Sequence, residues 1–254
     1  MTYNEIELFL PNLSSHLRDF SENLYSQNFL SLKSVSNRIG KLDKENGHFF
    51  EFMKINKKGK CPFCGISDMK GIYHSKREAY DHYLPKAIYP FNSINFRNLA
   101  PACHECNSSY KLSKNPIYCC KSPLSSNSGA RRKSFYPYQT ENYSIQLEIA
   151  LDCQDWTDLK PDNIEIKVGP NEYLEELEAW LDIYGIEERY KAKCCGKNDG
   201  KYWIEQVWDE SKNYEMQPQE IINIKKAASR KFALCRSQFF KKSFFRGVSS
   251  GGVV

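Results

Sequence analysis

The sequence lacks the long apolar runs that cross a membrane. No stretch of its 254 residues approaches the roughly 18 consecutive apolar residues that a transmembrane helix needs. The first ten residues, MTYNEIELFL, also lack the basic start and the extended apolar core of a secretory signal peptide. These absences argue against a membrane partner and against secretion, and we therefore expect a cytoplasmic protein.

Acidic residues are absent from two segments, although the net charge of the whole chain is only +5. No Asp or Glu occurs between Cys106 and Thr140, or between Ile221 and Val254. The first segment carries the basic cluster Arg131, Arg132 and Lys133. Two basic segments on an otherwise acidic chain indicate a polyanionic partner, most often nucleic acid, but two solvated surfaces would give the same pattern.

Apolar periodicity predicts an α+β protein. We expect four regions along the chain. An N-terminal helical region (1–58) precedes a cysteine-bearing core (59–120), and a basic loop or linker (121–143) leads to a C-terminal hairpin followed by helices (144–254). The C-terminal region is expected to contain a helix capped by Asn171, with Leu174, Leu177, Leu181 and Tyr184 on one face and Gly185 just past its end. A last helix is predicted over about 217–245. One-domain and two-domain arrangements are both open.

Four of the ten cysteines form two Cys-x-x-Cys pairs. In a reducing compartment such pairs are typical of metal ligands rather than disulfides. The pairs Cys61/Cys64 and Cys103/Cys106 would give a tetrahedral zinc site with no open position, so the zinc is predicted to be structural. Residues 65–102 separate the pairs, more than the roughly 15–20 residues of a short zinc ribbon, so a folded element should lie between them. The other six cysteines are interpreted as small core residues.

That intervening element holds an Asp81-His82 pair. Neighbouring side chains on an extended segment point to opposite sides, which suits two roles around one phosphate. His82 can act as a general base, and Asp81 can bind a divalent cation together with Asn107, just after the second cysteine pair. An oxygen-only ligand set favours Mg²⁺, with Mn²⁺ able to replace it. Asn98 is a candidate for bridging two loop segments through its amide.

The segment AYDHYLPK…NLAPACHECNSSYK, with CPFCG upstream, resembles the HNH (ββα-metal, His-Me finger) nucleases, in particular those with two zinc-binding cysteine pairs. The resemblance implies a β-hairpin and helix held together by zinc. It makes His82 the general base, Asp81 and Asn107 the ligands of the catalytic cation, and Asn98 the residue that orients the hairpin loop. Asn107 stands where other members have His, a variant that preserves ligation.

The resemblance implies a metal-dependent endonuclease that acts on nucleic acid. It favours DNA over RNA as the substrate, because DNA is the usual substrate of the family. A looser likeness, to the Septu and retron-associated nucleases, implies an anti-phage role beside an ATPase partner. Lys86 and Lys111 flank the site and are candidate phosphate contacts, although each is also typical of a solvated surface. Two alternatives stay open: a zinc-containing nucleic-acid-binding module without turnover, and a subunit that is inactive without its partner.

Overall fold

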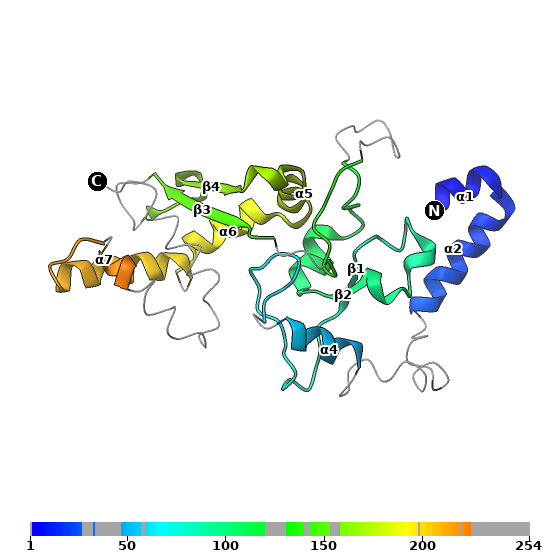
Figure 1. Ribbon diagram of the computed structural model, residues 1–254, viewed down its shortest axis with the longest axis horizontal. Helices are drawn as coiled ribbons and strands as arrows, with labels where there is room; N and C mark the ends of the chain where they lie inside the picture. Colours follow the sequence, from blue (N-terminus) through cyan, green and yellow to red (C-terminus); the bar gives the residue numbers. More distant parts are fainter. Residues whose placement is uncertain are drawn as a thin grey trace. The chain divides into compact units, whose positions relative to one another are not determined.

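The structure is a computed structural model, and it describes residues 2–26, 33, 47–56, 59–119, 131–139, 143–152, 158–197, 199–218 and 220–224. These residues combine helices with two small antiparallel sheets, so the predicted α+β class is confirmed (Figure 1). The chain divides into two compact units, Met1–Thr140 with Asp182–Tyr184, and Glu141–Leu181 with Gly185–Val254. The boundary after Thr140 falls inside the basic segment 121–143; the four-part division itself stays a prediction.

The N-terminal region is helical, as predicted, over the ranges that the structure describes. Its helices are α1 (Tyr3–Phe9), α2 (Pro11–Ser26) and α4 (His48–Ile55). Thr2 and Glu5 start α1 with a capping box: the Thr2 hydroxyl accepts from the Glu5 amide at 3.2 Å, and the Thr2 amide donates to the Glu5 carboxylate at 2.6 Å. Among the described residues, no helix is both long and apolar enough to cross a bilayer.

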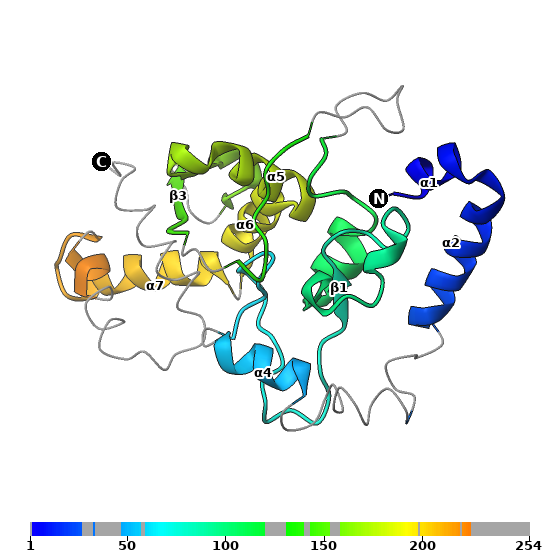
Figure 2. The same cartoon turned by 45° about the vertical axis from the view of Figure 1, so that its right-hand side comes forward.

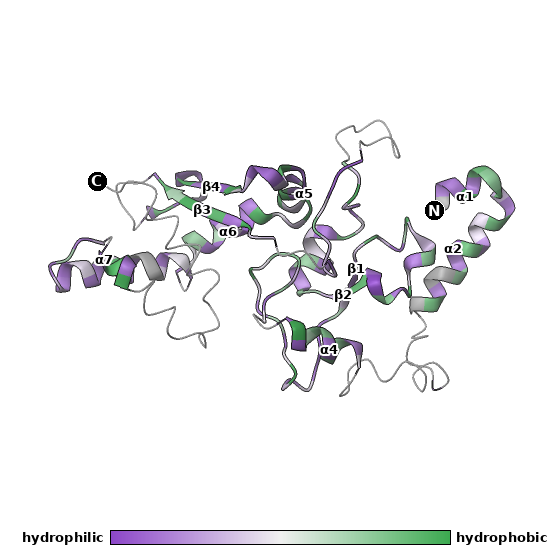
Figure 3. Cartoon of the chain, viewed as in Figure 1, coloured by the Kyte–Doolittle hydropathy of each residue, from purple (hydrophilic) through white to green (hydrophobic). Residues whose placement is uncertain are grey.

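Helix α4 follows the amphipathic pattern of its sequence. Phe49 and Met53, four residues apart, are buried, while Glu51 and Lys54 form an ion pair of 2.8 Å on the exposed side. Figure 3 shows the alternation of apolar and polar segments along this helix. The apolar face of α4 therefore contributes to the core of the first unit.

A short antiparallel hairpin carries the Asp81-His82 pair. β1 (Tyr80–His82) pairs with β2 (Leu99–Pro101), with Asp81 opposite Ala100 and His82 opposite Leu99. Every residue of both strands is buried, so neither strand shows the alternating pattern of a half-exposed sheet. The connection between them contains two 3₁₀ turns, η2 (Pro90–Asn92) and η3 (Phe96–Asn98).

A π-helical turn, η4 (Cys106–Lys111), follows β2 and contains the last cysteine of the second pair. Figures 1 and 2 show this helical turn beside β1, and a direct bond from Lys111 to Asp81 confirms the contact. The segment NSSYKLSK (107–114), just after the second cysteine pair, predicts a short helix. The helix instead ends at Lys111, because Leu112 has a positive φ of 49°, which cannot continue a right-handed helix.

The second unit begins with the predicted hairpin. β3 (Gln146–Leu151) pairs in antiparallel fashion with β4 (Ile164–Gly169), which follows the 3₁₀ turn η6 (Pro161–Asn163). Leu147 and Ile149 are buried while the residues on either side of Leu147 are exposed, the period-two pattern of a strand with one covered face. This pattern is strong in the sequence, and the hairpin prediction is confirmed.

Three helices follow the hairpin: α5 (Leu174–Tyr184), α6 (Ile186–Cys195) and α7 (Gly200–Asn213). Gly185 ends α5 in a left-handed conformation with φ 57°, as predicted. The prediction of Asn171 as the N-cap is wrong, because Asn171 is the first residue of a separate 3₁₀ turn, η7 (Asn171–Tyr173), that precedes the helix.

The predicted apolar face of α5 is correct only in part. Leu177 and Tyr184 are buried, but Leu174 is 53% exposed because the helix begins there. The last predicted helix is described only from Gln217 to Ile224, where residues 218 and 220–224 are helical. The rest of that prediction lies outside the described residues.

Candidate metal centre and active site

The four cysteines of the two pairs meet in one buried cluster. The Sγ atoms of Cys61, Cys64, Cys103 and Cys106 all lie within 4.8 Å of one another. The Cys64 and Cys103 sulfurs are 3.9 Å apart. Sulfurs at about 2.3 Å from a tetrahedral Zn²⁺ stand about 3.8 Å from each other, whereas a disulfide requires about 2.05 Å. The spacing fits a structural zinc ion held by the four predicted ligands.

The backbone of the first cysteine pair forms the tight turn that such a site needs. The Gly65 amide donates to the Cys61 carbonyl at 2.9 Å, and Gly65 has φ 67°, a conformation that a side chain would disfavour. Backbone amides also point at the sulfurs: Ile66 donates to Cys64 and Cys103 donates to Cys61, both at 3.4 Å. These amides place partial positive charge beside thiolates, and Gly65 ends the turn.

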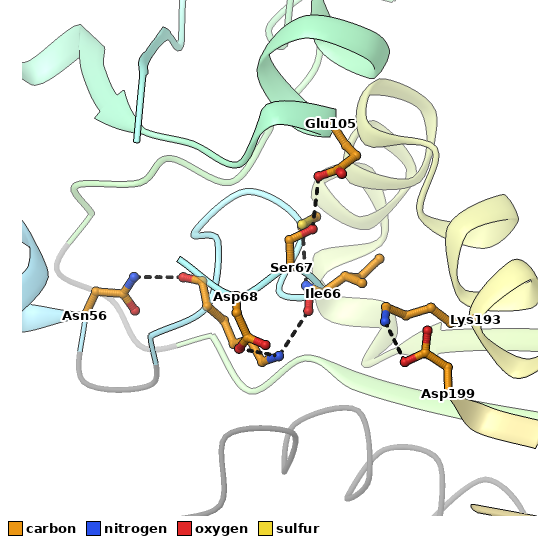
Figure 4. Close-up of polar contacts among 9 residues, drawn as sticks. Asn56, Ile66, Ser67, Asp68, Glu105, Lys193 and Asp199 are labelled. Atoms are coloured by element: carbon orange, nitrogen blue, oxygen red, sulfur yellow. Dashed lines mark hydrogen bonds and ion pairs between the residues drawn. The ribbon is translucent and has the colours of Figure 1, made fainter. Parts of the chain in front are cut away.

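Polar contacts outside the sulfurs brace the cluster (Figure 4). The buried Lys60 ammonium donates to the Ile66 carbonyl at 3.1 Å and pairs with Asp68 at 2.8 Å. The Ser67 hydroxyl donates to the Glu105 carboxylate at 3.3 Å and so links the first cysteine pair to the second. The two pairs are therefore joined by side-chain contacts as well as by the sulfurs.

Four thiols this close together cannot all ionise without a cation. Burial raises the pKa of Cys61 well above its usual value, and the hydrogen bond to Cys103 raises that of Cys106. Hydrogen bonds from Cys106 and Cys61 lower the pKa of Cys103 to about 5, so one thiolate forms at the expense of its neighbours. A divalent metal removes this conflict because it stabilises all four thiolates. With four sulfur ligands, that metal has no open position for a substrate.

His82 is held by its Nε2 atom. The imidazole is buried, and Nε2 lies 2.8 Å from the Ser93 carbonyl oxygen. A carbonyl only accepts, so Nε2 carries the proton and Nδ1 is the basic nitrogen of the neutral ring. Burial lowers the pKa of His82 to about 4, with smaller contributions from Lys86 and Lys111, and the Ser93 bond opposes the shift. The ring is therefore neutral and able to accept a proton at Nδ1.

Asn98 bridges two segments of the loop between β1 and β2. Its Oδ1 accepts from the Leu84 amide at 2.7 Å, and its Nδ2 donates to the Leu84 and Asn92 carbonyls, both at 3.0 Å. The side chain is buried, so these three bonds are shielded from water. The amide thus ties the segment after His82 to the segment that presents Ser93, the bridge expected from the sequence.

Lys111 does not occupy the surface position expected for a phosphate contact. It has 0% exposure, and its ammonium lies 3.1 Å from Asp81 Oδ1 and 2.5 Å from the His82 carbonyl oxygen. Burial raises the pKa of Asp81 to about 6, opposed by Lys111, and burial lowers the pKa of Lys111, opposed by Asp81. The solvated position expected for this lysine is wrong, because the carboxylate of Asp81 draws the ammonium inward.

The two residues expected to bind a catalytic cation fit that role by their chemistry. Asp81 Oδ2 is buried and, within the described part of the chain, has no hydrogen-bond partner. Asn107 is half-buried in η4, four residues before Lys111, so the two side chains lie on one side of the same helical turn. Carboxylate and amide oxygens are the kinds of ligand that Mg²⁺ prefers.

The basic residues 131–133 differ in their contacts and in their exposure. The Arg132 guanidinium pairs with Asp182 at 2.8 Å and also donates to the Pro116 carbonyl, so it is already engaged within the first unit. Arg131 and Lys133 are exposed, and Lys86 is half-buried. A contact between these residues and nucleic acid stays a prediction.

His48 belongs to a hydrogen-bonded chain that sequence reasoning did not identify. The Tyr138 hydroxyl donates to the Leu99 carbonyl at 2.5 Å and accepts from His48 Nε2 at 3.1 Å, which leaves His48 Nδ1 to accept from the Tyr80 hydroxyl at 2.9 Å. This chain joins α4, β1 and β2. His48 is structural, and its partners carry no signal in the sequence.

The remaining cysteines show no second metal cluster among the described residues. Cys194 is buried, and burial raises the pKa of its thiol to about 12, as expected for a core residue. Cys119 and Cys195 are half-buried. Cys120, Cys153 and Cys235 lie outside the described residues.

Comparisons with known proteins add one similarity. The chain is 36% identical over 76 residues to Protein ea31 of Escherichia phage lambda, a match that covers 30% of this chain and 23% of that protein. No family model and no solved structure matches the chain. The similarity thus spans about a quarter of the phage protein, and it assigns no family.

Proposed function

We propose that the protein is a metal-dependent endonuclease of the HNH type that hydrolyses the phosphodiester bonds of nucleic acid, with DNA favoured over RNA as the substrate. The observation that carries the proposal is the fixed tautomer of His82. Because Ser93 accepts the proton of Nε2, the imidazole offers Nδ1 as a base, and burial keeps the ring neutral. The neighbouring residue on β1, Asp81, provides a buried carboxylate oxygen without a partner among the described residues.

These groups divide the chemistry of hydrolysis between them. His82 accepts a proton at Nδ1 from the water that attacks phosphorus. Asp81 and Asn107 would hold Mg²⁺ or Mn²⁺, which stabilises charge on the phosphate and on the departing oxygen when it is bound. Asn98 keeps the loop that presents Ser93 against the segment after β1. The four-cysteine cluster, filled by zinc, fixes the start of η4 and hence the position of Asn107.

The test is cleavage of plasmid DNA with Mg²⁺, with and without chelator, followed by single-stranded DNA and RNA. We expect His82→Ala to lower cleavage by about 10²–10⁴-fold, the usual contribution of a general base. Zinc content should not change, because the four ligands of the cluster are cysteines and His82 is not one of them. The control is His74→Ala, an exposed histidine whose ring, among the residues that the structure describes, bonds to Gly71 alone. Wild-type cleavage by the His82→Ala protein would refute the assignment.

One observation favours a second candidate, a zinc-containing nucleic-acid-binding module without turnover. The Lys111 ammonium already neutralises Asp81, as a purely structural ion pair would. Binding of plasmid without nicking, at any concentration of Mg²⁺ or Mn²⁺, would support this candidate. The anti-phage role and the ATPase partner stay predictions, and co-purification of the chain with an ATPase would test them.

A further inference from the structure

Lys111 combines full burial with contacts to both residues proposed for catalysis. Its ammonium donates to Asp81 Oδ1 and to the His82 carbonyl, and its side chain has no exposed surface. Burying an ammonium is costly unless its donors are satisfied. Both acceptors lie on β1, so this one side chain fixes the strand that carries Asp81 and His82 against η4.

The backbone around Lys111 is unusual in two respects. The helical turn that ends at Lys111 is π-helical, a form that occurs mostly as single turns and often at functional sites. The next residue, Leu112, has φ 49° and is 58% exposed, an unfavourable conformation for a branched apolar residue. The chain therefore departs from a regular helix at the point where the ammonium enters the core.

The two oxygens of the Asp81 carboxylate have different surroundings. One oxygen, Oδ1, is 3.1 Å from the ammonium, and the other, Oδ2, is buried and has no hydrogen-bond partner among the described residues. An ammonium beside the same carboxylate repels a divalent cation through a medium of low dielectric constant. The arrangement thus orients Oδ2 while it weakens the attraction of the carboxylate for a second positive charge.

We propose that Lys111 is a positioning residue and the built-in counter-ion of the site. It holds Asp81 and the backbone of His82 in place and shares the carboxylate with the incoming divalent cation. This inference rests on the proposed function. Because the shared carboxylate binds the cation weakly, phosphate oxygens of the nucleic acid complete the site, and the cation and the substrate bind cooperatively.

The test compares Lys111→Met, which keeps chain length but removes the charge, with the zinc-loaded wild type at pH 8. Mn²⁺ binding without nucleic acid is followed by the electron paramagnetic resonance of free Mn²⁺. We expect the Mn²⁺ Kd of Lys111→Met to fall at least about 10-fold by loss of repulsion. Cleavage at saturating Mn²⁺ should nevertheless fall at least about 10-fold, because Asp81 and β1 lose their anchor. Lys111→Arg, which keeps the charge, should leave the Kd within about threefold of wild type.

Lys114→Met is the matched control, since it removes the same charge from an exposed position in the same segment. It should change neither affinity nor cleavage. Unchanged or weaker Mn²⁺ binding by Lys111→Met would overturn the inference, as would full cleavage by that variant.

A measurement on the wild type keeps the inference testable if Lys111→Met does not fold. Mg²⁺ should shift the NMR signals of the Lys111 Cε methylene, and Asp81→Asn should abolish the shift; an unshifted signal at saturating Mg²⁺ would overturn the inference. Failure of the proposed function looks different. In that case the wild type binds Mn²⁺ through Asp81, with the Lys111 effects on affinity intact, and cuts no nucleic acid.

Discussion

The two buried polar clusters of the first unit satisfy their polar atoms in opposite ways. In the cysteine cluster all four sulfur atoms converge on one point, and the surrounding backbone amides donate hydrogen bonds to the sulfurs. In the Asp81–His82–Lys111 cluster, Lys111 donates to Asp81 and to the His82 carbonyl, and His82 donates to the Ser93 carbonyl, while one carboxylate oxygen remains unpaired within the described residues. A closed cluster suits a structural metal, whereas an incomplete one suits a site where something else must bind.

The largest expected effect comes from opening the closed cluster. Cys61→Ser together with Cys64→Ser should abolish zinc binding and unfold the first unit, because a structural zinc contributes roughly 10–16 kcal/mol in zinc-finger peptides. The measurement is zinc content, with circular dichroism and hydrogen exchange of the β1–β2 hairpin. The control is Cys195→Ser, a half-buried cysteine that is not one of the four clustered ones. A first unit that keeps hairpin protection after zinc is lost would break the comparison.

The two clusters also differ in how far the sequence could predict them. The Cys-x-x-Cys pairs and Gly65 form local turns, so their spacing alone predicted the ligands. The hairpin β3–β4 was found for the same reason, because Leu147 and Ile149 alternate with exposed residues. Features that depend on residues close together in the chain can be predicted from the sequence without knowledge of the fold.

Long-range contacts were predictable only where a family resemblance provided them. Asp81, His82, Asn98 and Asn107 were chosen together, and the structure gives three of them buried positions near one another in the chain's hairpin. Ser93 was not foreseen, since a backbone carbonyl carries no residue-type signal. Lys111 was misread because a lysine is nearly always exposed, and only the buried Asp81 explains its inward position.

An effect of intermediate size is expected from Asn98, whose side chain connects two segments of the β1–β2 loop through hydrogen bonds and not through a metal. Asn98→Ala leaves the Leu84 amide and the Leu84 carbonyl without their side-chain partner and removes one of two donors to the Asn92 carbonyl, which should lower the free energy of unfolding by about 2–4 kcal/mol. The measurement is denaturant unfolding, with hydrogen exchange at the Leu84 amide as the local readout. Zinc content should be unchanged.

The control for this change is Asn95→Ala. Asn95 is exposed, and its side chain accepts one backbone bond, from Arg97 at 3.0 Å. Its loss should cost about 1 kcal/mol, as for other caps of short helices. Equal losses for Asn98 and Asn95 would mean that burial of the bridge adds nothing, and the contrast between the two clusters would then rest on the cysteines alone.

The smallest expected effect concerns the hydroxyl that links His48 to the hairpin. Tyr138→Phe removes the group that accepts from His48 Nε2 and donates to the Leu99 carbonyl, while the ring packing is kept. We expect a loss of about 1 kcal/mol, measured by denaturant unfolding of the zinc-loaded protein. Tyr136→Phe removes a comparable bond, to the Arg97 carbonyl at a more exposed position, and should cost less. If Tyr138→Phe costs no more than Tyr136→Phe, then the chain of bonds from α4 to β2 does not support β1, and the hairpin depends on the zinc cluster and Asn98 instead.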